Sequence, residues 1–149
     1  MTEKDTGDVE VAVNNKKFDL GNYVNPDEAT GEFLNLLNPA TGEPLLDDNG
    51  EQVGIYLLGK DSEVYRRAQR TITNRRLSRK GSSAITAERI ESEANEVLAH
   101  CTASWQGIVY QGDEVDCSFS MAKRIYTQIP WVKEQVDEFI AERANYLGK

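Results

Sequence analysis

The sequence predicts an α+β protein: antiparallel β-hairpins in the first 59 residues, then a mostly helical region with one further short hairpin. Up to residue 59, short stretches rich in β-branched and aromatic residues alternate with turn signals, as in hairpins. From residue 60 onward, apolar residues recur at the three- and four-residue spacing of a helix face. Gln111-Gly112-Asp113 interrupts this pattern and predicts a hairpin near residues 107–117. We expect the two regions, 1–59 and 60–149, to form one compact domain.

The β region divides at its turn residues. Residues 1–8 are polar, and we expect a frayed end there. Val9–Val13 alternates with period two, as a half-buried strand does, and Phe18–Leu20 is its predicted partner strand. Asn49-Gly50 is a strong hairpin turn signal, and Val53–Leu58 after it is the strongest strand prediction in the chain.

The helical region begins after Gly59, where Asp61 or Ser62 is the predicted cap of a first helix. After a flexible break at 81–83, Thr86 is the predicted cap of a second helix. The predicted buried face of the first helix is Val64, Tyr65, Ala68 and Ile72, and that of the second is Ile90, Ala94, Val97, Leu98 and Cys101.

Pro130 divides the C-terminal helical sequence in two. Proline lacks a backbone donor and has a fixed φ, so it ends one helix and suits the first turn of the next. The apolar positions that follow are Val132, Val136, Phe139, Ile140 and Leu147, which predict an amphipathic helix packed on an apolar surface.

Composition narrows the classes of function. The net charge of −8 and isoelectric point near 4.7 argue against general nucleic-acid binding. No apolar run approaches the ~18 residues that a membrane helix needs, and Met1–Asp5 lacks the features of a signal peptide. We therefore expect a cytoplasmic protein, not bound to membrane, in which Cys101 and Cys117 are reduced.

Three segments resemble chemical sites only in part. Gly54–Asp61 approaches a phosphate-binding loop, but Asp61 replaces the required hydroxyl and the segment is an apolar strand. Asp47–Glu51 suggests a calcium loop, but with Gly50 as its glycine such a loop would need an oxygen ligand at position 45, which is Leu45. A hairpin turn is therefore the preferred interpretation. His100 and Cys101 are adjacent on a helix and point about 100° apart, which disfavours a nucleophilic pair. The sequence predicts no catalytic, cofactor or metal site, and hence no enzyme.

One segment is strongly basic. From Lys60 to Lys80 the sequence has eight basic and two acidic residues. The segment therefore carries a net charge of +6, and the remainder of the chain carries −14. Three interpretations stay open: a solvated face neutralised by nearby acids, a docking surface for a partner protein, or a nucleic-acid surface. The acids expected on the next helix are Glu88, Glu91, Glu93 and Glu96.

Three residues are candidate partner-binding positions. Arg75 and Arg79 continue the angular sector of the first helix's apolar face, so we expect that helix end to project beyond the core. Trp131 directly follows Pro130 at a helix start and is a candidate exposed anchor. The other large aromatic residues are expected in the core.

Several short motifs follow one another between roughly residues 50 and 147, most densely at the C-terminus. They are Gly59-Lys60-Asp61-Ser62, Tyr65-Arg66-Arg67-Ala68-Gln69-Arg70, Trp105-x-Gly107 with the hairpin after it, Tyr126, Pro130-Trp131-Val132, Gln135-Val136, Phe139-Ile140 and Arg143-Ala144-Asn145-Tyr146-Leu147. In their order and spacing they resemble the tail assembly chaperones of long-tailed bacteriophages.

The resemblance implies a non-enzymatic protein of the infected host's cytoplasm. Members of that family coat the tape measure protein, keep it soluble and help recruit tail-tube subunits; self-association is a further option here. Two alternatives remain: a structural component of the tail or virion, and a nucleic-acid-associated regulator that uses the basic helix 66–80. Nucleic-acid binding is disfavoured by the acidic remainder of the chain.

Overall fold

The computed structural model describes residues 18–23, 30–79 and 85–147, and within these it confirms the α+β class. A three-stranded antiparallel sheet has the order β1-β2-β3, formed by Glu32–Asn35, Gly54–Leu57 and Thr102–Gln106. A separate hairpin consists of β4 (Val109–Tyr110) and β5 (Asp113–Glu114). The helices are α1 (Glu63–Leu77), α2 (Ala87–His100), α3 (Phe119–Gln128) and α4 (Pro130–Ala141), with short 3-10 helices η2 (Leu20–Tyr23) and η3 (Arg143–Asn145).

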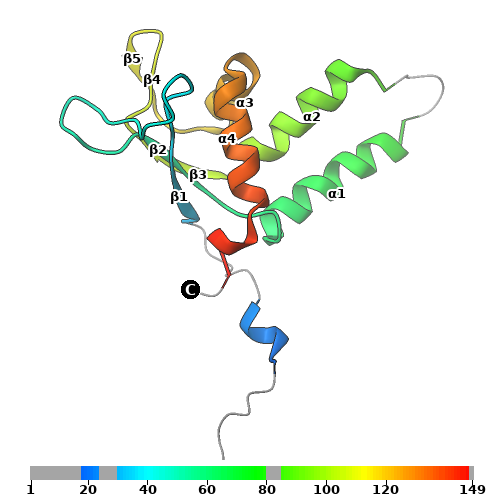
Figure 1. The fold of residues 1–149 in the computed structure, drawn as a ribbon. Coiled ribbons are helices and arrows are strands. Elements are labelled where there is room, and N and C mark those ends of the chain that lie inside the picture. The colour runs from blue at the N-terminus through cyan, green and yellow to red at the C-terminus, as the bar shows by residue number, and fades with distance from the viewer. Residues whose placement is uncertain (1–17, 24–29, 80–84, 148–149) are drawn as a thin grey trace, which may run out of the picture.

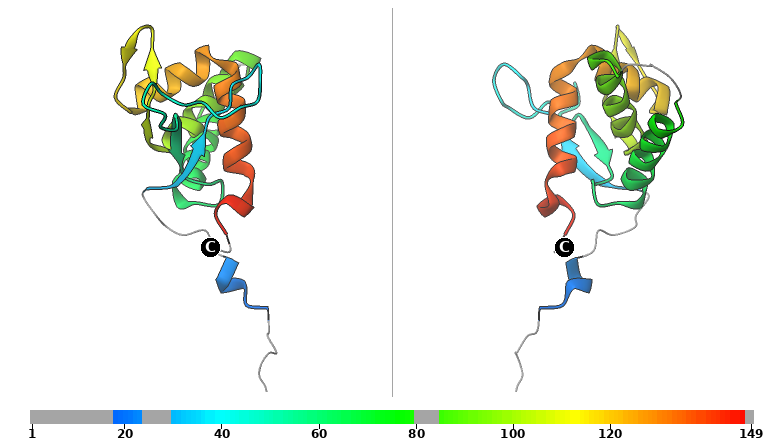
Figure 2. Two further views of the ribbon diagram at one scale, coloured as in Figure 1. Left: turned by 60° about the vertical axis from the view of Figure 1, so that its left-hand side comes forward. Right: turned by 90° about the vertical axis from the view of Figure 1, so that its right-hand side faces the viewer.

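Successive side chains of β2 point to opposite faces of the sheet. Ile55 and Leu57 are buried in the main core, whereas Tyr56 on the opposite face is half-buried and contacts the ring of Phe33. Helices α2, α3 and α4 pack against one another beside the sheet, and α1 lies along α2 (Figure 1). Two further views show α4 running past β1 (Figure 2). The main core therefore forms where the helices meet one face of the sheet.

Several predicted boundaries are confirmed. Ser62 accepts a hydrogen bond from the Tyr65 amide and caps α1, and Thr86 caps α2 through the Arg89 amide. Pro130 is the first residue of α4. The Asn49-Gly50 turn closes a small hairpin, in which the Asp47 carboxylate accepts from the amides of Asn49 and Glu51.

Strand β3 was not predicted, and it connects the two halves of the chain. Its residues Thr102–Gln106 pair with β2, so the sheet crosses the predicted division at residue 59. The backbone N–H of Leu58 also donates to the Cys101 carbonyl, and that of Lys60 to the Ile140 carbonyl. Because these amides are already paired, Gly54–Asp61 has no free cradle for a phosphate.

Three other predictions need correction. Phe18–Leu20 is not a strand: the Asp19 carboxylate accepts from the Gly21 amide and a 3-10 helix begins at Leu20. On α2, Ile90 and Ala94 are exposed, and the buried positions include Glu93, Asn95 and Ala99. Helix α4 ends at Ala141, so Leu147 lies beyond it. The frayed end at 1–8, the strand Val9–Val13 and the break at 81–83 lie outside the described residues.

Candidate functional site

The site with the clearest shape is an apolar hollow of about 240 Å³ beside Trp131, which we call the Trp131 hollow. It lies between the sheet, the β4–β5 hairpin and the junction of α3 and α4. Its lining includes no charged side chain. The lining residues are Leu36, Leu45, Val53, Ile55, Trp105, Gly107, Ile108, Val109, Tyr110, Ile125, Ile129, Trp131 and Val132.

Gly107 brings the chain from β3 into the wall of the hollow. Its φ of +73° lies in the left-handed region that favours glycine, and an added Cβ would lie 3.0 Å from a methyl group of Val53. The preceding Trp105 donates from its indole Nε1 to the Val115 carbonyl at 2.9 Å. The Trp-x-Gly motif therefore fixes the hairpin against the sheet.

The β4–β5 hairpin forms the outer wall and carries the exposed rim. Gln111 and Gly112 both have positive φ, as a tight two-residue hairpin turn requires. The hydroxyl of Tyr110 donates to the side-chain oxygen of Gln128 on α3, which attaches the hairpin to the helices. Val109 remains 60% exposed at the rim.

Trp131 is half-buried and packs against the main core while it lines the hollow. Ile129 precedes the helix without a side-chain cap, and Pro130 starts α4. This sharp junction brings Trp131 next to the hairpin. The lining has no charged side chain and its one hydroxyl, that of Tyr110, is bonded to Gln128, so what the hollow offers is the burial of an apolar side chain.

The other two candidate residues lie elsewhere. Arg75 donates two hydrogen bonds to the Glu96 carboxylate on α2, at 3.3 and 3.0 Å. These bonds lower the pKa of Glu96 and raise that of Arg75. Arg79 is half-buried, and its buried Nη1 atom has no hydrogen-bond partner among the described residues. The end of α1 lies on the opposite side of the molecule from the β4–β5 hairpin (Figure 1), so Arg75 and Arg79 do not join Trp131 in one site.

Acids of α2 neutralise two of the arginines in the basic segment, Arg75 and Arg76. Arg76 donates twice to one oxygen of Glu93, and Glu63 is surrounded by Arg66, Arg67 and Arg70. Glu93 and Glu96 are two of the acids that the sequence placed opposite this segment. These ion pairs favour the interpretation of a neutralised face over that of a nucleic-acid surface.

His100 and Cys101, the candidate nucleophilic pair, lie in different surroundings. Cys101 is fully buried, while the His100 ring packs on Phe119 with the centroids 4.5 Å apart. Among the described residues, no group of three histidine, cysteine or acidic side chains is arranged to hold a metal ion. No helix in the described ranges has the length and apolarity needed to span a membrane.

The two free thiols should react at different rates. Burial raises the pKa of Cys101 to about 12, and it also raises the pKa of the half-buried Cys117. We expect iodoacetamide at pH 8 to alkylate Cys117 in the folded protein at least about tenfold faster than Cys101, since Cys101 must await opening of the core. Mass spectrometry of tryptic peptides measures both rates. As a control, the two cysteines should react at equal rates in guanidinium, where the protein is unfolded. Equal rates in the native protein would contradict the burial of Cys101.

The sequence singled out Trp131 as an exposed anchor, whereas the structure has it half-buried in the lining of the hollow, and its neighbours there were not singled out. Ile108, Val109 and Tyr110 were assigned only to a hairpin, although an apolar hairpin edge next to Trp105-x-Gly107 was a usable signal. Comparisons with protein-family models, with curated proteins and with solved structures give no match to this chain.

Proposed function

We propose that this protein is a phage tail assembly chaperone, which binds and solubilises the tape measure protein and helps recruit tail-tube subunits in the host cytoplasm. One observation carries the proposal: residues of the family resemblance converge on the Trp131 hollow. Trp105 and Gly107 come from one motif and Trp131 and Val132 from another, and all four line it. Motifs 25 positions apart in sequence thus share one apolar surface, as a binding site would require.

The chemistry of the hollow suits the proposed ligand. A tape measure protein is a long helical chain with apolar side chains to be shielded before assembly. An apolar anchor residue seated in a small pocket is the usual energetic centre of such an interface. The chain's net charge of −8 opposes aggregation of the resulting complex.

The test is co-expression with the tape measure protein of the same genome, followed by size-exclusion chromatography. Wild-type protein should keep the tape measure protein soluble and co-elute with it. Val109→Asp places a charge at the exposed rim and should reduce the co-eluting tape measure protein at least about tenfold, because a buried unpaired charge is costly.

Ile90→Asp is the matched control, because Ile90 is 51% exposed on α2 and outside the hollow. It should behave as wild type, and circular dichroism should show both variants folded. Two results together would favour the structural alternative over the chaperone proposal. The tape measure protein would stay insoluble with wild-type protein, and purified particles would contain this chain. Equal solubilisation by both variants would exclude the hollow as the site.

A further inference from the structure

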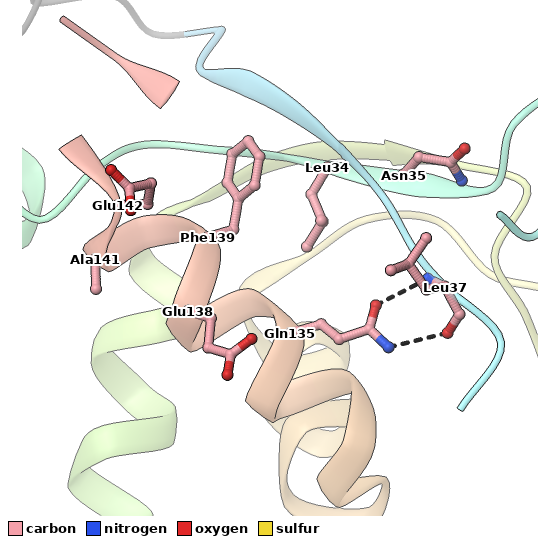
Figure 3. A pocket seen from close by; sticks show the side chains of 8 residues that line it. All are labelled: Leu34, Asn35, Leu37, Gln135, Glu138, Phe139, Ala141 and Glu142. Atoms are coloured by element: carbon pink, nitrogen blue, oxygen red, sulfur yellow. Dashed lines mark hydrogen bonds between the residues drawn. The ribbon is translucent and has the colours of Figure 1, made fainter. Parts of the chain in front are cut away.

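A second hollow, of about 600 Å³, lies between β1 and α4, and we call it the β1–α4 groove. It shares no lining residue with the Trp131 hollow, so the two are separate surfaces. Its apolar walls are Leu34, Leu37, Phe139 and Ala141, and Figure 3 shows the side chains of Leu34 and Phe139 next to each other there. The groove therefore offers an apolar surface alongside a strand of the sheet.

Strand β1 is at the edge of the sheet, where it pairs with β2 on one side only. The amide of Leu36 donates to the Val53 carbonyl at 3.0 Å, so Leu36 and, by alternation, Leu34 direct their backbone groups toward β2. Phe33 and Asn35 then direct theirs outward. Within the described part of the chain, no hydrogen bond reaches these outward groups, so they can pair with another backbone.

A side chain already satisfies the next outward position along this edge. Gln135 of α4 accepts from the Leu37 amide through Oε1 at 2.8 Å and donates to the Leu37 carbonyl through Nε2 at 2.9 Å (Figure 3). A glutamine amide has the same donor and acceptor pair as a peptide group. At Leu37 it takes the place that a neighbouring strand would have, which shows that the outer side of the edge can bind a peptide-like group.

The β1–α4 groove has negative charge without a counter-charge. Glu138 and Glu142 line it, and no basic side chain does. Within the described ranges neither carboxylate has a salt-bridge partner, because Arg143, the nearest arginine in the sequence, pairs with Asp61 instead, with Nη2 3.0 Å from Oδ1. A ligand of this groove therefore gains from a positive charge.

We propose that the β1–α4 groove binds an extended segment of a partner protein, apolar at every second residue and basic at its flank, which adds to β1 as a further strand. The backbone of the segment pairs with the outward groups of Phe33 and Asn35, and its apolar side chains lie in the groove. Its basic side chain lies beside Glu138. Because Gln135 already occupies Leu37, the pairing ends there and the site takes a short segment.

Charge and backbone chemistry favour this occupant over a second copy of the chain or a helical ligand. Two copies each carry a net charge of −8 and repel one another, whereas a basic segment is attracted to the acidic groove. A helix has already paired its backbone groups with one another, so it cannot satisfy Phe33 and Asn35. An extended segment has both its donors and its acceptors available for an edge strand.

Amide hydrogen exchange, measured by NMR on the full chain with a peptide probe, tests the proposal. The probe is the acetylated and amidated peptide KTVTVTK, in which valines alternate with threonines between lysine ends. At saturation it should slow exchange of the Phe33 and Asn35 amides at least about tenfold, because these amides become hydrogen-bonded. The Leu34 amide, directed toward β2, is the internal reference and should not change. The peptide ETVTVTE, with acidic ends, should bind about fivefold more weakly.

Charge reversal in the groove gives a second measurement. Glu138→Lys should weaken binding of KTVTVTK about fivefold, whereas the matched control Asp137→Lys, at an exposed position of α4 outside the groove, should leave it unchanged. Unchanged exchange at Phe33 and Asn35 with the probe, or equal binding of the two peptides, would overturn the proposal. Protection of these amides without any probe would also overturn it: protection that rises with protein concentration would assign the edge to a second copy, and protection independent of concentration would assign it to another part of this chain.

Discussion

Val136→Asp is expected to remove most of the protein's stability, with a loss of at least about 4 kcal/mol in the free energy of unfolding. Val136 is 0% exposed and belongs to the main core that α4 forms with the sheet and the other helices. A carboxylate there finds no solvent, and a neutral acid would still be a polar group in an apolar core. Typical domains have only about 5–15 kcal/mol in total, so this single change should unfold much of the population.

Urea denaturation followed by circular dichroism measures the loss. Val109→Asp is the matched control: the same substitution at a residue that is 60% exposed should change the free energy of unfolding by no more than about 0.5 kcal/mol. Similar losses for the two variants would show that α4 does not pack as described. A large loss for Val136→Asp alone would establish α4 as part of the core.

Local signals were sufficient where the stabilising interaction is itself local. The helix starts at Ser62, Thr86 and Pro130 each depend on a residue within the first turn, and the sequence predicted all three, with Asp61 as an alternative to Ser62. Strand β3 was missed because only Thr102 and Trp105 among its five residues favour strands, and they do not alternate with period two. It is a strand because β2, more than forty residues earlier, supplies its hydrogen-bond partners.

The buried face of α2 also depends on tertiary contacts that the local sequence does not reveal. Apolar periodicity assigned Ile90 and Ala94 to the core, yet Asn95 is buried and donates to the Thr127 hydroxyl on α3. Such polar burial depends on a partner from another helix, which a single helix pattern cannot show. The Trp131 hollow was likewise predictable only through Trp131, because the hairpin reaches it by tertiary contacts of Trp105 and Tyr110.

Arg76→Met should be the second most damaging change, with a loss of about 3 kcal/mol in the free energy of unfolding. Arg76 donates to Glu93 Oε1 through Nε at 3.0 Å and through Nη2 at 2.6 Å. Glu93 is only 5% exposed, and within the described ranges its Oε2 atom has no hydrogen-bond partner. Without Arg76, a buried carboxylate would lose its counter-charge and both of these hydrogen bonds.

The double variant Arg76→Met with Glu93→Leu tests whether the loss in Arg76→Met comes from the unpaired charge of Glu93. Replacing both charges by apolar side chains removes the desolvation cost along with the attraction, so stability should return to within about 1 kcal/mol of wild type. Arg70→Met is the control, since its partner Glu63 is solvent-accessible and the loss should stay below about 1 kcal/mol. Urea denaturation of the four proteins gives the comparison. If the double variant is as unstable as Arg76→Met, packing by the arginine stem, and not the stranded charge of Glu93, holds α1 against α2.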